Sequence, residues 1–239
     1  IIAKEIEEKK IITSNNPIIA RTENDQLILK SGQAYQIDYV GTNQNGIQLF
    51  AYVSSVGKVT LKKHYQDLDL FSTYNNIVRC PEKSCANEMI NEIKKVANDG
   101  DTIGGEITAV AKNVPVGLGE PVFDKLSASL AKAMLSINAV HSFKYGFHNS
   151  DISSSKGSQV NDILINSSGV TKTNFSGGIV GGISNGNDIN FTVSFKPVST
   201  IMKDQKTINE SGDKIKISGK GRHDAVSYTH LRAHETLGN

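Results

Sequence analysis

Tryptophan is absent from this 239-residue sequence, and cysteine is nearly so. The two cysteines, Cys80 and Cys85, lie within RCPEKSC, with no second pair and no nearby histidine. This spacing disfavours a zinc site and predicts two reduced thiols, so no metal is expected. No apolar run approaches the ~18 residues that a membrane-spanning helix needs, and no secretory signal is visible. We therefore expect a cytoplasmic protein without a membrane partner.

An excess of charge of one sign is missing as well. The sequence has 26 lysines and arginines against 24 aspartates and glutamates, which gives a net charge of +2. So small an imbalance argues against a nucleic-acid-binding surface but permits a local basic pocket. With 38% hydrophobic residues the chain can bury a core, and its length suits one large domain or two small ones.

Two segments have the apolar spacing of amphipathic helices. The first runs from Ser84 to Asp99 and is followed by Gly100, a natural helix stop. The second follows Asp124, whose side chain is suited to cap it. We interpret both apolar stripes as core packing. They comprise Ala86, Met89, Ile90, Ile93 and Ala97 in the first helix, and Leu126, Leu130, Met134 and Ile137 in the second.

The N-terminal part of the sequence mixes several signals. Residues 1–12 alternate charge and isoleucine in a helix-like way, and residues 13–45 predict a loop-rich insertion with one or two short strands. Residues 46–61 predict a pair of strands with a turn at Ser54–Gly57. The stretch that begins at Ile103 predicts another strand, which runs into a loop rich in glycine and proline.

The clearest strand signal lies in residues 189–195, where apolar and polar residues alternate strictly. This pattern predicts a strand with Phe191, Val193 and Phe195 buried and a polar opposite face, which favours an antiparallel sheet covered on one side. The sequence has no regular βαβ alternation and no internal repeat. Helices and antiparallel strands together indicate an α+β fold, in which helices cover antiparallel sheets.

The stretch SGGIVGGISNG at residues 176–186 is unusually rich in glycine. A phosphate-binding P-loop would need Gly-Lys-Ser/Thr after the glycines, and a dinucleotide fingerprint would need a different spacing before a helix. Two interpretations remain: a flexible loop, or main chain that a ligand approaches closely. The strand that follows ends at Lys196 and continues with Pro197, Ser199 and Thr200, which together would suit an anion.

Several longer motifs agree in order and spacing with one family. GDTIGGEITAVAKNVPVGLGEPVFDKL, AKAMLSINAV, SGGIVGGISNG, FKPVSTI and KGRHD occur in this order, and over roughly residues 46–224 the chain resembles chorismate synthases. AYVSSVG and VRCPE resemble the same family upstream. The resemblance implies the α+β fold of that family, a homo-oligomer (a tetramer), and reduced FMN as cofactor. It further implies the 1,4-elimination of phosphate from 5-enolpyruvylshikimate 3-phosphate, which gives chorismate.

The resemblance also implies a set of site residues. Gly181 lies where the main chain would contact FMN, and Asp224 is the candidate for proton handling near the flavin. A lysine, an arginine and free backbone N–H groups would stabilise a phosphate or an electron-rich flavin. The implied cofactor-binding residues are Asn138, Ala139, Gly181, Lys196, Pro197, Val198, Ser199, Thr200 and Arg222, and the implied catalytic residue is Asp224.

Parts of the family pattern do not match. The Gly-Glu-Ser-His-Gly motif is absent, and His64, His141 and His148 match no catalytic motif. We therefore expect residues 1–224 to be a partial domain that is inactive alone, followed by a non-native tail at residues 225–239. The sequence leaves open whether NADPH or an external reductant reduces the flavin. The alternatives are a flavin- or nucleotide-binding α+β module without catalysis, and a structural domain whose glycines only form turns.

Overall fold

The computed structural model of the chain describes residues 9–13, 16–20, 36–37, 46–147, 152–167 and 169–219. The chain forms two compact units. Unit 1 comprises Ile1–Ala51, Thr108–Ala133 and Lys144–Thr192, and unit 2 comprises Tyr52–Ile107, Met134–Phe143 and Val193–Asn239. Within the described residues, no helix is both long and apolar enough to cross a bilayer.

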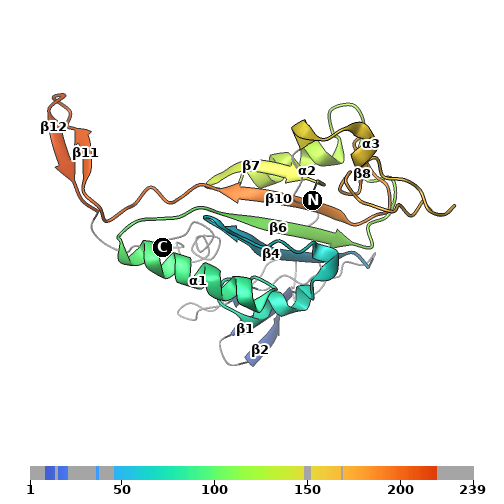
Figure 1. Cartoon of the computed structure of the whole chain (residues 1–239), viewed down its shortest axis with the longest axis horizontal. Coiled ribbons are helices and arrows are strands. Elements are labelled where there is room, and N and C mark those ends of the chain that lie inside the picture. Colours follow the sequence, from blue (N-terminus) through green and yellow to red (C-terminus); the bar gives the residue numbers. More distant parts are fainter. Residues whose placement is uncertain are drawn as a thin grey trace. The chain divides into compact units, whose positions relative to one another are not determined.

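The largest sheet of the described residues has five strands in the order β5-β4-β6-β10-β7 (Figure 1). Side-chain hydrogen bonds pair Thr108 with Thr192 at 3.0 Å and Glu106 with Ser194 at 2.8 Å, so β6 and β10 run antiparallel. The predicted α+β fold with antiparallel strands is therefore confirmed. The strands are β4 (Gln48–Val56), β5 (Val59–Thr60), β6 (Gly105–Lys112), β7 (Val140–Tyr145) and β10 (Ile189–Phe195).

The predicted turn of the first strand pair is shifted. Ser54 and Ser55 are buried inside β4, and Val56 pairs with Val59, which leaves Gly57 and Lys58 as a two-residue turn. The prediction placed the turn too early because serine is common in turns. Here the hydroxyl of Ser54 instead donates to the carbonyl of Glu106 on the neighbouring strand.

The core of unit 1 packs around the ends of β6 and β10. Helix α2 (Leu126–Leu135) carries Leu126, Leu130 and Met134 of the predicted apolar stripe, all of them half-buried, but it ends before Ile137. The N–H of Leu126 donates to the carbonyl of Gly182 at 2.7 Å, so a backbone group satisfies the start of this helix. The buried cluster is Ala111, Val114, Ile179 and Ile189, and Ile47, Leu49, Leu126, Leu130 and Phe191 pack against it.

Burial along β10 differs from the prediction in two respects. Val193 and Phe195 are buried, but Phe191 is only half-buried, because it lies at the rim of the unit 1 cluster. The polar face is not open to solvent either, since Asn190 is only 3% exposed and Thr108 on the adjacent strand only 1%. The expectation of a sheet covered on one side is therefore wrong for this strand.

The core of unit 2 contains helix α1 (Lys83–Asn98), which confirms the helix predicted for residues 84–99. Ala86 and Met89 of its apolar stripe are buried, and Gly100 ends it with a φ of +68°. Cys80 and Cys85 are both buried and free, as predicted. Burial raises the pKa of both thiols, and that of Cys85 rises to about 12. Two short 3-10 helices precede α1. They are η2 (Tyr65–Asp67) and η3 (Leu70–Asn75).

The remaining elements form small sheets and turns. The helix predicted for residues 1–12 is wrong where the structure describes it, because β1 (Lys9–Thr13) pairs antiparallel with β2 (Asn16–Ala20). Ile11, Ile12 and Thr13 are β-branched, which suits a strand. With β3 (Gln36–Ile37) these strands form a three-stranded sheet, so the predicted short strands within residues 13–45 are present. The other elements are η4 (Ile152–Ser154), α3 (Gly157–Val160), β8 (Ile179–Val180), β9 (Ile183–Ser184), β11 (Gln205–Ile208) and β12 (Lys214–Ile217).

Candidate functional site

The glycine-rich stretch in unit 1 forms a tight β-hairpin. Val180 of β8 pairs with Ile183 of β9, so Gly181 and Gly182 are the two central residues of the turn. Their φ angles are +62° and +91°, a combination that L-residues rarely adopt and that a type I′ two-residue turn requires. A Cβ on Gly181 would meet no heavy atom within 4 Å, so the main chain at the hairpin tip is accessible. The turn geometry therefore accounts for these two glycines, and the approach of a ligand to this main chain stays a prediction.

A single carboxylate fixes the entry to this hairpin. Asp162 accepts hydrogen bonds from the hydroxyl of Thr173 at 2.7 Å and from the N–H groups of Phe175 and Ser176, both at 2.8 Å. Burial acts to raise the pKa of Asp162, but these hydrogen bonds outweigh it and lower that pKa below its usual value. Asp162 was not identified from the sequence, because its partners lie more than ten positions away and leave no local pattern.

In unit 2, two of the predicted flavin motifs lie side by side. The N–H of Lys196, just after β10, donates to the carbonyl of Ala139, just before β7, at 2.9 Å. Ala139 has a φ of +68°, an uncommon conformation for a residue with a side chain. Asn138 and Lys196 are both exposed. The sheet therefore brings together residues that the family resemblance alone had grouped.

A hydrogen-bonded chain of side chains holds the two strand ends that carry these motifs. The hydroxyl of Ser142 on β7 donates to that of Ser194 on β10 at 2.7 Å, and Ser194 in turn donates to Glu106 of β6 at 2.8 Å. The polar alternation of β10 indicated Ser194 as polar, but the sequence gave no sign of its partners. Cross-strand pairs of this kind stabilise a sheet and its register.

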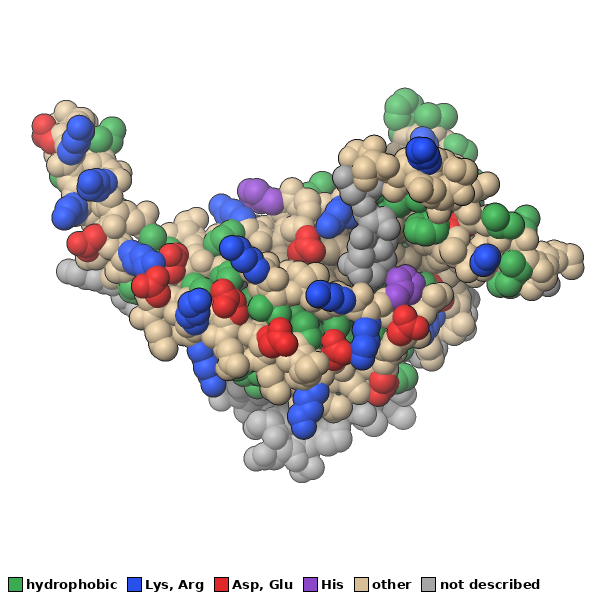
Figure 2. Space-filling view, viewed as in Figure 1, with side chains coloured by type: hydrophobic (Ala, Val, Ile, Leu, Met, Phe, Trp, Pro, Cys, Tyr) green, Lys and Arg blue, Asp and Glu red, His purple; other side chains and the backbone are tan. Residues whose placement is uncertain are grey.

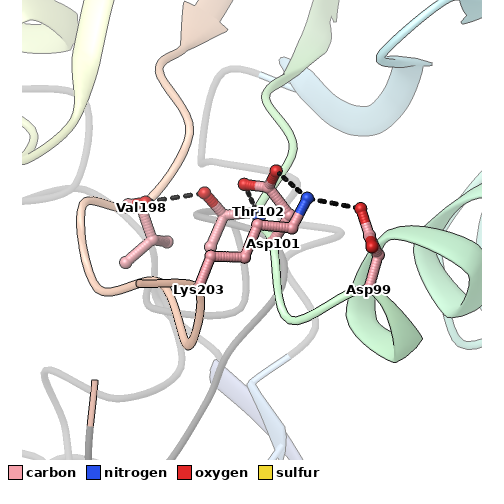
Figure 3. Close-up of polar contacts among 5 residues, drawn as sticks. All are labelled: Asp99, Asp101, Thr102, Val198 and Lys203. Carbon is pink, nitrogen blue, oxygen red and sulfur yellow. Dashed lines mark hydrogen bonds and ion pairs between the residues drawn. The ribbon is translucent and has the colours of Figure 1, made fainter. Parts of the chain in front are cut away.

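The segment from Lys196 to Thr200 packs against the loop that follows α1. A Cβ on Gly104 would lie 2.7 Å from the carbonyl oxygen of Phe195 and 3.2 Å from Pro197, so only glycine permits this approach. The hydroxyl of Thr102 donates to the carbonyl of Val198 at 2.7 Å (Figure 3). The strand predicted to begin at Ile103 is β6, which begins at Gly105, directly after this contact.

Lys203 holds the C-terminal end of this segment through two ion pairs. Its ammonium group lies between the carboxylates of Asp99 and Asp101, bonding to both and lying 3.0 Å from Asp101 (Figure 3). The hydrogen bond from Lys203 to Asp99, followed by that to Asp101, raises the pKa of this lysine. The N–H of Met202 also donates to the carbonyl of Gly100 at 2.8 Å, so a backbone hydrogen bond holds the C-terminal end of the segment next to the end of α1.

The middle of the segment presents hydrogen-bond donors. Within the described ranges, no group accepts a hydrogen bond from the N–H of Val198, Ser199 or Thr200, and both hydroxyl-bearing side chains are exposed. Consecutive N–H groups beside a lysine and hydroxyls form a surface suited to an anion such as a phosphate.

A separate groove of about 680 Å³ lies in unit 2 between α1 and the β4–β5 hairpin. Its lining carries charges of both signs, so it does not select an anionic ligand. Figure 2 likewise shows basic and acidic side chains interspersed over the face that carries α1. We therefore assign no role to this groove. Its charged lining residues are Lys58, Lys62, Lys95, Glu88 and Glu92.

Other predicted residues are placed differently or not described. Gly181 belongs to unit 1, whereas Asn138, Ala139 and the segment from Lys196 to Thr200 belong to unit 2. Arg222 and Asp224 lie outside the described residues.

The histidines of the described part have local structural contacts. His64 accepts a hydrogen bond from the N–H of Gln66 at 3.4 Å and caps η2, and burial lowers its pKa. A ring nitrogen of His141 lies 3.0 Å from the carbonyl oxygen of Val140. His148 lies outside the described residues. Within the ranges that the structure covers, no group of three or more His, Cys, Asp or Glu side chains is arranged to hold a metal.

Comparisons with known proteins agree on one family. Residues 37–233 match the chorismate synthase family. Over 176 residues the chain is 56% identical to a chorismate synthase of Christiangramia forsetii, covering 73% of this chain and 49% of that protein. A chorismate synthase of Flavobacterium psychrophilum is 53% identical over 180 residues, covering 74% of this chain and 50% of that protein.

The solved structures give the same result. A crystal structure of a chorismate synthase matches with a TM-score of 0.58 and 28% sequence identity, covering 64% of this chain and 50% of that one. The chain spans about half the length of the curated relatives it matches.

Proposed function

Because the chain belongs to the chorismate synthase family, we propose that the protein at its full natural length converts 5-enolpyruvylshikimate 3-phosphate to chorismate. The reaction is a 1,4-elimination that releases phosphate and serves aromatic amino-acid biosynthesis. When bound, reduced FMN would lend electron density to the elimination and recover it, so the reaction would have no net redox change. The flavin would be reduced by NADPH or by an external reductant.

One observation supports this proposal most strongly. The backbone hydrogen bond from Lys196 to Ala139 joins the two motifs that the family resemblance assigns to flavin binding. They are distant in the sequence and meet only because β7 and β10 are neighbours in the sheet. An arrangement that served turns alone would not require an exposed lysine beside N–H groups for which the described part of the chain offers no acceptor.

The roles of the residues follow from their chemistry. Lys196 would bind an anionic group of FMN, with the N–H groups and hydroxyls of Ser199 and Thr200 as further donors. Gly181 would offer main chain to the flavin without a Cβ in the way. Arg222 would add a second cation, and Asp224 would hold or move a proton near the flavin.

Asn138 and Ala139 would complete the flavin-binding set with Pro197 and Val198. The left-handed backbone at Ala139 and the close packing of Pro197 on Gly104 fix the path of both segments. Preformed donors of this kind cost little reorganisation when a ligand binds.

The assembly and extent of the protein are part of the proposal. We infer a cytoplasmic homo-oligomer, a tetramer, when the protein has its full length. We also infer that residues 1–224 belong to a partial chorismate synthase domain, in which residues 13–45 are an insertion, and that the sequence of residues 225–239 is not native to it. The 239 residues alone, which span about half of their relatives, would not turn over.

An anaerobic assay tests the activity. The protein at its full natural length is mixed with 5-enolpyruvylshikimate 3-phosphate and chemically reduced FMN, and phosphate and chorismate are measured. Equal amounts of both products are expected, and neither without reduced FMN. A folded protein that binds FMN but releases no phosphate would favour the alternative, a flavin-binding module without catalysis.

A further inference from the structure

The peptide bond between Val198 and Ser199 has its orientation set by one hydroxyl. The hydroxyl of Thr102 donates to the carbonyl of Val198 at 2.7 Å, as Figure 3 shows. Thr102 is itself held, because its N–H donates to the carboxylate of Asp101 at 2.8 Å. The carbonyl of Val198 therefore points toward the loop that follows α1.

A trans peptide directs the carbonyl and the next N–H to opposite sides. Because the carbonyl of Val198 points at Thr102, the N–H of Ser199 points away from it. Ser199 is exposed, and no described group accepts a hydrogen bond from its N–H. This donor is therefore directed outward from the packed side of the segment.

Both ends of the segment are fixed independently of Thr102. The N–H of Lys196 bonds to Ala139, and the N–H of Met202 bonds to Gly100. Lys203 bonds to both Asp99 and Asp101. Between these ends, the hydroxyl of Thr102 is the described side-chain group that bonds to the peptide joining Val198 and Ser199.

We propose that Thr102 is a positioning residue that aims the N–H of Ser199 at the phosphate of bound FMN. The inference rests on the proposed function for the identity of the ligand. Thr102 itself does not contact the ligand; it acts through the carbonyl of Val198. A donor aimed in advance at an anion binds it better than one that must first be oriented.

Two substitutions in the protein at its full natural length separate this role from a general loss of packing. Thr102→Val keeps the shape of the side chain but removes the hydroxyl, whereas Thr102→Ser keeps the hydroxyl. Thr207→Val is the matched control, because Thr207 is exposed on β11 and its side chain makes no hydrogen bond to a described residue. Affinities for FMN and for riboflavin, which lacks the phosphate, are measured by titration of flavin fluorescence.

Thr102→Val is expected to weaken FMN binding about tenfold, the scale of one hydrogen bond to a charged group, and to leave riboflavin binding unchanged. Thr102→Ser and Thr207→Val should both bind FMN as the unaltered protein does. Unchanged FMN affinity in Thr102→Val would overturn the proposal. An equal loss for FMN and riboflavin would overturn it too, because the effect would then not be directed at the phosphate.

Amide order parameters, measured by NMR relaxation without any flavin, separate this inference from the proposed function. The order parameter of the Ser199 amide should be lower in Thr102→Val than in Thr102→Ser. Equal order parameters in the two variants would overturn the positioning role even if the unaltered protein binds FMN. A lower value in Thr102→Val, together with no FMN binding by the unaltered protein, would keep the positioning role and refute the flavin assignment.

Discussion

Asp162→Asn is the substitution whose effect the structure defines best. The Oδ1 atom of Asp162 accepts from Thr173 and Phe175, and its Oδ2 atom accepts from the N–H of Ser176. Asparagine can keep the first two bonds, but its amide nitrogen then faces the N–H of Ser176, donor against donor. Losing one hydrogen bond to a charge and leaving a donor unpaired costs about 1–3 kcal/mol. Because Asp162 is half-buried, we expect Asp162→Asn to lower the free energy of unfolding, measured in urea at pH 7, by about 1–2 kcal/mol.

The pH dependence gives this prediction a second readout. The pKa of Asp162 is lowered in the folded protein, so its carboxylate stabilises the fold above the unfolded pKa of about 3.9. That stabilisation is lost as the pH falls through the folded pKa. The difference in unfolding free energy between the unaltered protein and Asp162→Asn should therefore shrink in strong acid.

Asp204→Asn is the matched control for this substitution, because Asp204 is exposed and makes no hydrogen bond to a described residue. It should leave stability at pH 7 nearly unchanged. If Asp162→Asn is as stable as Asp204→Asn at pH 7, the carboxylate does not hold the hairpin entry, and the reasoning is refuted.

Three further substitutions or treatments test the site and the core. Lys196→Ala should weaken FMN binding by about 1–3 kcal/mol, the scale of a lost charge-assisted hydrogen bond; unchanged affinity with unchanged folding would remove Lys196 from the site. Gly104→Ala should cost about 1–3 kcal/mol of stability through overpacking against Phe195, while Gly157→Ala, whose Cβ would meet nothing within 4 Å, should cost little. Iodoacetamide should modify Cys85 at pH 8 far more slowly in the native than in the unfolded protein, because burial raises the pKa of this thiol to about 12. Equal rates in the two states would show that the thiol is accessible to the reagent in the folded protein.

The sequence predicted elements whose information is local. The apolar spacing of residues 84–99 predicted a helix that begins and ends almost where α1 does. The alternation in residues 189–195 predicted a strand. The motifs with Asn138 and Lys196 indicated a shared site, although only the sheet order explains why they meet. Residues 9–12 were mispredicted because a short run of lysine and isoleucine fits helix and strand spacing equally well.

The residues that sequence reasoning missed act through contacts between distant segments. Thr102 bonds to Val198, Glu106 bonds to Ser194, and Asp162 bonds to Ser176. None of these pairs leaves a period or a spacing in the sequence, because the fold alone decides which polar groups meet. The half-buried state of Phe191 belongs to the same class, since it depends on where the unit 1 cluster ends.

The central claim is that the segment from Lys196 to Thr200, next to Asn138 and Ala139, binds FMN. A crystal structure of the protein at its full natural length, soaked or grown with FMN, tests it most directly. The account predicts the FMN phosphate within hydrogen-bonding distance of the N–H of Ser199 and the ammonium of Lys196. FMN bound elsewhere, with residues 196–200 facing only solvent, would contradict it.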